Sequence, residues 1–92
     1  MDKDKLKSQL VSEGFPSIYE WIDKPGTKYD SHSHKGKVSL LIVSGSVAFS
    51  DGFEKVLKEG DRFDVPAGVS HSAIVGPEGC EYIVGEEIEG DS

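Results

Sequence analysis

The stretch Gly26-Thr27-Lys28-Tyr29-Asp30-Ser31-His32-Ser33-His34 decides how this chain folds, together with Pro66-Ala67-Gly68-Val69-Ser70-His71. All three histidines of the 92-residue chain lie in these two segments. His32 and His34 are two residues apart, so on a β-strand both side chains point to the same face. His71 opens a later predicted strand, and a closed sheet could bring its ring to the same point. Three neutral nitrogen ligands on one side of a metal ion leave open coordination positions, which is typical of a catalytic metal site.

The sequence around these segments predicts about eight short strands. Apolar residues recur with period two, and glycine and proline separate the runs, while Asp51-Gly52 fits the two-residue turn of a hairpin. This spacing favours an all-β fold, an antiparallel sandwich or barrel, over an α/β fold. The predicted strands cover residues 17–23, 28–34, 38–44, 47–50, 53–57, 62–66, 71–75 and 80–85.

The N-terminal segment predicts a short helix over residues 2–14. Leu6, Leu10 and Val11 recur at helical spacing, and Gly14 followed by Pro16 ends the pattern. The helix is expected to brace one side of the sheet. The whole chain, residues 1–92, is interpreted as one domain, with residues 1–14 as the helical segment and residues 86–92 as an acidic tail that frays.

Composition argues against several partners. The net charge is −7, and Arg62 is the only arginine, so we expect neither nucleic acid nor an anionic membrane surface as a partner. The single cysteine, Cys80, excludes a disulfide within the chain and fits a reducing, cytoplasmic location. A domain this small has little core, so we expect a homodimer that buries more apolar surface.

The two histidine segments resemble the two motifs of the cupin superfamily. Gly26-x5-His32-x-His34, followed by Gly45, is similar to the first motif, G-x5-H-x-H-x3–4-E-x6-G. The segment from Gly60 through Pro66 and Gly68 to His71 is similar to the second, G-x5-P-x-G-x2-H-x3-N. The likeness covers residues 26 to about 75. It implies a small double-stranded β-helix, or jelly-roll barrel, in which His32, His34 and His71 hold one divalent metal ion.

The chain departs from those motifs at two positions. The glutamate of the first motif falls at Val38, or at Ser39 in the longer spacing, and the asparagine of the second falls at Val75. Three histidines leave the +2 charge of the ion uncompensated, which favours an anionic ligand from outside the protein. They also favour metals that accept imidazole, here Fe, Ni, Cu, Zn or Mn. An alternative is that Glu20, Asp30 or Glu54 supplies a more distant oxygen ligand to the ion.

These observations predict a metal-dependent enzyme acting on a small molecule, of the oxygenase or isomerase kind, with no catalytic residue assigned. The alternative is a non-catalytic barrel that binds a metal or a small ligand, since one fold serves both. Strand parity predicts a mostly apolar pocket around the histidines, shared by Asp30, Val38, Leu40, Ile42, Ala73 and Val75. Further contacts could come from Trp21, Tyr29, Cys80 and Tyr82.

Overall fold

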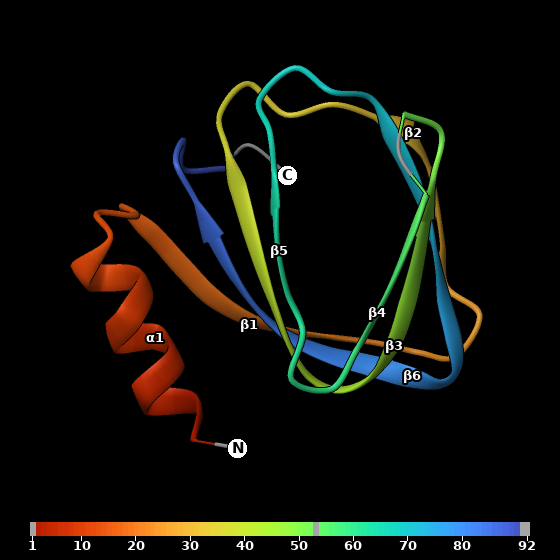
Figure 1. Ribbon diagram of the computed structural model, residues 1–92, viewed down its shortest axis with the longest axis horizontal. Helices are drawn as coiled ribbons and strands as arrows, with labels where there is room; N and C mark the ends of the chain where they lie inside the picture. The colour runs from red at the N-terminus through yellow and green to blue at the C-terminus, as the bar shows by residue number, and fades with distance from the viewer. Residues whose placement is uncertain (1, 53, 91–92) are drawn as a thin grey trace.

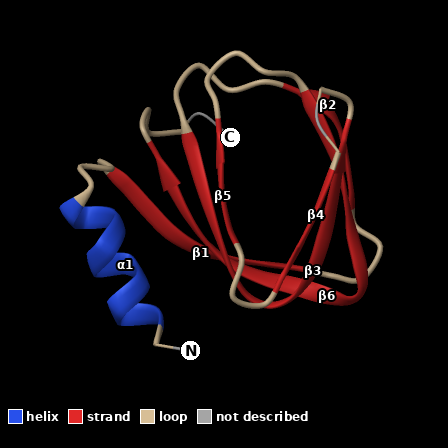
Figure 2. Cartoon of the chain, in the orientation of Figure 1, coloured by secondary structure: helices blue, strands red, loops and turns tan. Residues whose placement is uncertain are grey.

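The computed structural model describes residues 2–52 and 54–90, and it shows one short helix followed by a curved antiparallel sheet (Figures 1 and 2). Among the described residues no helix has both the length and the apolar character needed to cross a membrane. The elements are α1 (Lys3–Ser12), β1 (Ser17–Asp23), β2 (Lys28–His32), β3 (Val38–Ser50), β4 (Lys55–Lys58), β5 (Arg62–Val65) and β6 (His71–Glu86).

The two long strands, β3 and β6, bend and take part in both faces of the fold (Figure 1). On one face, residues 80–86 of β6 lie between β1 and residues 38–45 of β3, and β5 pairs with the other side of β3. On the other face, residues 71–75 of β6 lie between β2 and residues 47–50 of β3, which also pairs with β4. The two faces enclose the interior, as predicted for a double-stranded β-helix.

In the described part of the chain six strands replace the eight that were predicted, because β3 and β6 continue where breaks were expected. The pairing register shifts instead: Val75 and Cys80 pair with Val47 and Gly45. Gly45 has φ 76, and a Cβ there would lie 2.0 Å from the backbone oxygen of Gly79, so only glycine permits this close approach. Long-range pairing therefore overrides the local turn signals.

The hairpin between β3 and β4 differs in length from the prediction. Asp51 and Gly52 both have positive φ, as a type I′ turn requires. The pairing of Phe49 with Lys55, however, makes the connection longer than two residues. Phe53, the predicted start of the next strand, lies outside the described residues.

The predicted helix is confirmed, and it braces the outer face of the sheet. Asp2 caps it by accepting a hydrogen bond from the backbone of Lys5. Leu10, which is 0% exposed, packs with Phe15 against Leu41 and Ile83, two partners in the β3–β6 ladder. This outer core is separate from the two apolar clusters that belong to the interior.

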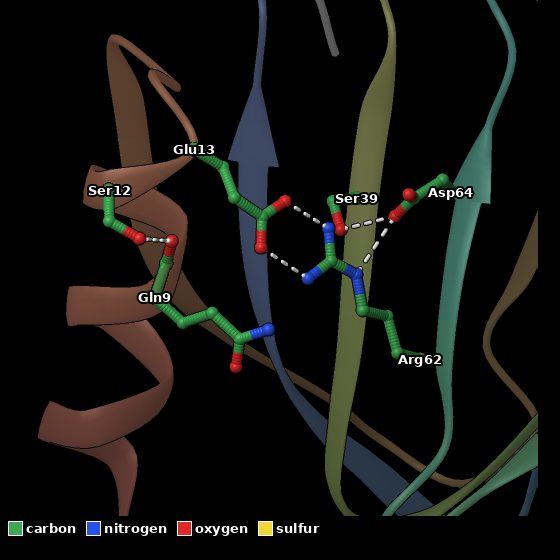
Figure 3. A network of polar contacts seen from close by, with 6 residues as sticks. All are labelled: Gln9, Ser12, Glu13, Ser39, Arg62 and Asp64. Carbon is green, nitrogen blue, oxygen red and sulfur yellow. Dashed lines mark hydrogen bonds and ion pairs between the residues drawn. The ribbon is translucent and has the colours of Figure 1, made fainter.

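A polar network ties the end of α1 to the sheet (Figure 3). Arg62 donates from both terminal nitrogens to Glu13, at 2.6 and 2.7 Å, and from Nε to Asp64. Asp64 also accepts a hydrogen bond from the buried Ser39 hydroxyl. The hydrogen bonds to Glu13 and Asp64 raise the pKa of Arg62 further above its usual value, so the only arginine is a structural cation on the outer face.

The prediction that residues 86–92 fray is wrong for Glu86. Glu86 ends β6, pairs with Ser17 and Val38, and is only 1% exposed. Glu87 follows with a backbone hydrogen bond to Lys37. The ladder with two neighbouring strands holds this segment, which composition alone could not indicate.

Candidate metal centre

The structure brings His32, His34 and His71 together inside the curved sheet. His32 ends β2 and pairs directly with His71 at the start of β6, and His34 follows two residues later in the connection to β3. The ring centroids are 4.5 Å apart for His32 and His71, 5.0 Å for His32 and His34, and 5.1 Å for His34 and His71. One ring nitrogen from each residue lies within 4.8 Å of the others.

The donor set fits a transition metal ion. Three imidazoles that bind one ion at about 2.1 Å from the same side have their nitrogens about 3.0–3.6 Å apart, so rings whose nitrogens lie within 4.8 Å need to move closer by roughly an ångström to coordinate it. Backbone carbonyls orient two of the rings: Nδ1 of His32 lies 2.7 Å from the oxygen of Asp30, and Nδ1 of His71 lies 3.1 Å from that of Val69. A carbonyl only accepts, so Nδ1 must carry the proton, and Nε2 presents its lone pair.

His71 is held in the form that binds metal. Its side chain is 2% exposed, and burial lowers its pKa below the usual value, with smaller contributions from His32 and His34. The hydrogen bond to Val69 acts in the opposite direction. A neutral imidazole is the required ligand, because protons compete with metal for the same lone pair.

The three histidines open onto a cavity of about 350 Å³ whose walls are mostly apolar. Of the residues predicted to share this face, Val38, Leu40, Ile42 and Ala73 line the cavity. Val75 is buried in the neighbouring core cluster instead. The sequence did not single out Val47, Phe49, Val65 and Val84, which complete the apolar wall.

Asp30 does not share this face, contrary to the parity prediction. It is exposed, while Tyr29 lines the cavity. The register of β2 against β6 shifts between Tyr29 and His32, so residues three apart in sequence point to the same side. A β-bulge of this kind reverses every parity count made through it.

A second polar group in the cavity centres on Asp23, which is 8% exposed. The Tyr29 hydroxyl donates to it at 2.7 Å, the Tyr82 hydroxyl also at 2.7 Å, and Trp21 Nε1 at 3.0 Å. Burial, followed by the hydrogen bond to Asp23, raises the pKa of both tyrosines. The Tyr29 ring is 6.5 Å from the His32 ring, so this group adjoins the histidines. Sequence reasoning named the three aromatic residues but not the carboxylate that joins them.

Glu86 is the second carboxylate of the cavity, and it was missed entirely. It accepts a hydrogen bond of 3.1 Å from the Tyr19 hydroxyl. Tyr82, Val84 and Glu86 alternate along β6 and all line the cavity. The alternation of these three residues is present in the sequence. The acidic composition of residues 86–92, however, led to the assignment of Glu86 to a tail.

The remaining candidates lie elsewhere. Glu20 forms ion pairs with Lys3 and Lys7 on the surface, and Glu54 is exposed. Cys80 is buried in the core, where burial raises the pKa of its thiol to about 11, as expected for a small apolar residue rather than a nucleophile. None of these three, nor Arg62, lines the cavity.

Comparisons with known proteins agree with this architecture. No family model and no curated protein matches the sequence. Solved structures do match: an RmlC-like cupin from Shewanella frigidimarina is 29% identical with a TM-score of 0.68, over 80% of this chain and 68% of that one. The chain has the fold of a small cupin domain. The fold class predicted from the two histidine segments is thereby confirmed.

Two further cupin structures extend the comparison. A variant of Bacillus subtilis oxalate decarboxylase is 25% identical with a TM-score of 0.71, over 82% of this chain but only 22% of that one. KdgF from Halomonas sp. is 21% identical with a TM-score of 0.59, over 83% of this chain and 84% of that one, and supports the fold alone. The cupin fold and the three-histidine group together suggest metal binding.

Proposed function

We propose that His32, His34 and His71 hold one divalent transition metal ion and that the chain is a metal-dependent enzyme acting on a small molecule, of the oxygenase or isomerase kind. One observation carries this proposal: three convergent imidazoles, two with Nε2 directed away from a backbone carbonyl, face a cavity rather than the packed core. Fe, Ni, Cu, Zn and Mn all suit imidazole ligands.

The residues of the cavity define what could bind there. The bound ion would supply Lewis acidity toward an oxygen of the ligand. The aliphatic wall, formed by residues such as Val38, Leu40 and Ile42, excludes bulk water and accommodates a small, partly apolar ligand. Since the three histidines carry no negative charge, an anionic group on the ligand would bind best. Oxalate decarboxylase, a structural relative, is named for such an anion.

A non-catalytic binding module is the second candidate. Within the described residues all histidines belong to the metal group, so none is left as a separate general base. Incubating the metal-loaded protein with small carboxylates and following each by mass spectrometry would discriminate the two. Conversion with turnover supports the enzyme, and saturable binding without conversion supports the module.

Metal titration tests the site itself. We expect stoichiometric binding of at least one of Fe(II), Ni(II), Cu(II), Zn(II) or Mn(II) by isothermal titration calorimetry. His71→Ala should abolish binding while far-ultraviolet circular dichroism stays unchanged, because the cavity already tolerates open space. Ser72→Ala, next in β6 and bonded to Ser50 away from the cavity, is the matched control. Stoichiometric binding by His71→Ala would remove that residue from the site.

A further inference from the structure

The side chain of Glu86 is a buried carboxylate in mostly apolar surroundings. It is 1% exposed, and its ladder partner Val38 packs in an apolar cluster with Val65 and Val84. Among the described residues, Tyr19 is the only side chain that hydrogen-bonds to it. Burying a carboxylate with a single neutral donor is costly, since an ionised oxygen normally accepts several hydrogen bonds. A carboxylate retained in such surroundings is expected to serve a ligand.

Asp23, the other carboxylate of the cavity, provides the contrast. Trp21, Tyr29 and Tyr82 all donate to it, and Tyr29 lies within hydrogen-bonding distance of both oxygens. Its acceptor capacity is largely used by the protein. Of the two carboxylates in the cavity, Glu86 is therefore the one with fewer side-chain donors from the described residues.

The location of Glu86 relates it to the histidines. It is the antiparallel partner of Val38, the first residue of β3, which follows His34 by four positions. Directly opposed residues have Cα atoms about 5 Å apart and side chains on the same face. Both side chains line the cavity that the histidines line. Glu86 is not within the group whose ligand atoms lie within 4.8 Å of one another, so it stands beyond the three nitrogens.

We propose that Glu86 is the anionic partner of the metal centre: its carboxylate compensates part of the +2 charge of an ion held by the three histidines and leaves the remainder for an anionic ligand. The charge of the ion and the buried carboxylate each account for the other. Three neutral ligands leave an uncompensated +2 charge in a mostly apolar cavity, and Glu86 is a buried carboxylate that lines the same cavity. Attraction between such charges is strong where water is scarce. The inference rests on the proposed metal binding and adds a fourth residue from a strand outside the two histidine segments.

Metal affinity tests this inference without knowledge of a substrate. Glu86→Gln keeps the shape and an acceptor for Tyr19 but removes the charge. We expect its affinity for the metal that the unaltered protein binds, measured by calorimetry, to fall about 10- to 100-fold, as for partners outside the ligand shell in other metal sites. Glu87→Gln is the matched control, since Glu87 is exposed one residue further on, and it should change the affinity less than about twofold.

A charge-conserving variant makes the test sharper. Glu86→Asp keeps the carboxylate on a shorter side chain, and it should retain most of the affinity that Glu86→Gln loses. If Glu86→Gln does not fold, Glu86→Met, which fills a similar volume without a buried polar group, should show the same loss.

Two outcomes separate this inference from the proposed function. If the unaltered protein binds none of the metals, the metal site itself is wrong, and Glu86 with it. If it binds metal and Glu86→Gln binds as tightly, the site stands and only the role of Glu86 is refuted. A further readout addresses a purely structural role. The metal-free Glu86→Met protein should be at least as resistant to urea as the unaltered protein, whereas a structural carboxylate would make it less resistant.

Discussion

Asp23 anchors three aromatic side chains of the cavity wall, and we predict that Asp23→Ala lowers the free energy of unfolding by about 2–4 kcal/mol. The substitution deprives the Tyr29 and Tyr82 hydroxyls of their acceptor. Each partly buried donor left without a partner costs about 1–3 kcal/mol, which gives about 2–6 kcal/mol for the two. Trp21 is 50% exposed, so water can accept its hydrogen bond instead. Relief from burying the Asp23 carboxylate offsets part of the cost and brings the sum into the lower half of that range.

The assay is urea unfolding at pH 7, followed by far-ultraviolet circular dichroism. Asp30→Ala is the matched control, because Asp30 is an exposed carboxylate nearby on β2, and its removal should cost less than about 0.5 kcal/mol. Adding Tyr82→Phe to Asp23→Ala should recover part of the stability, since one unpaired hydroxyl is then removed. A loss below about 1 kcal/mol for Asp23→Ala would refute the view that the two hydroxyls depend on this carboxylate.

Two further predictions concern stability. Leu10→Ala should lower the free energy of unfolding in urea by about 2–5 kcal/mol, because the Leu10 side chain is fully buried between α1 and the sheet. Val11→Ala is the control: Val11 is 64% exposed, and its truncation should cost under about 0.5 kcal/mol. Equal losses would show that α1 does not pack as described. Burial, with Asp23, raises the pKa of Tyr82 in the folded protein. The folded protein thus holds the Tyr82 hydroxyl proton more tightly than the unfolded chain does. The resulting contribution to the free energy of unfolding is complete below about pH 10. Above that pH it falls by up to about 1.4 kcal/mol per pH unit. Urea unfolding at pH 8 and pH 11 should show that fall, and Tyr82→Phe should reduce it; an identical pH dependence in both proteins would contradict it.

The sequence allowed the metal group to be predicted from two simple rules. Residues two apart on a strand share a face, which placed His32 and His34 together, and the order of the two segments in a closed sheet placed His71 beside them. The first rule holds only in part, because β2 ends at His32 rather than at His34 as predicted, and His34 lies just beyond the strand. The structure confirms that meeting point. Binding of a metal there, the homodimer, the cytoplasmic location and the lack of nucleic-acid or membrane partners remain predictions.

The errors arose where local pattern and long-range pairing disagree. Parity placed Asp30 in the cavity because a regular ladder was assumed, and the register shift before His32 turned it outward. Glycine signals divided β6 in two, although pairing with β3 keeps it continuous. Glu86 was assigned to a fraying tail from its acidic neighbours. In each case the decisive partner is far away in sequence, where spacing rules cannot reach.

The outer core under α1 follows from the cost of the cavity. A domain of 92 residues has little interior to spare, and this one leaves about 350 Å³ of it unfilled beside the histidines. Apolar packing elsewhere in the domain must therefore offset the open space. Leu41 and Ile83 point away from the cavity on β3 and β6, and Leu10 and Phe15 cover them. Because neighbouring residues on these strands alternate between the two cores, the packing that holds α1 also fixes the strands that carry Leu40, Ile42 and Val84 into the cavity wall. The helix thereby supports the site from outside while leaving its interior open to a ligand.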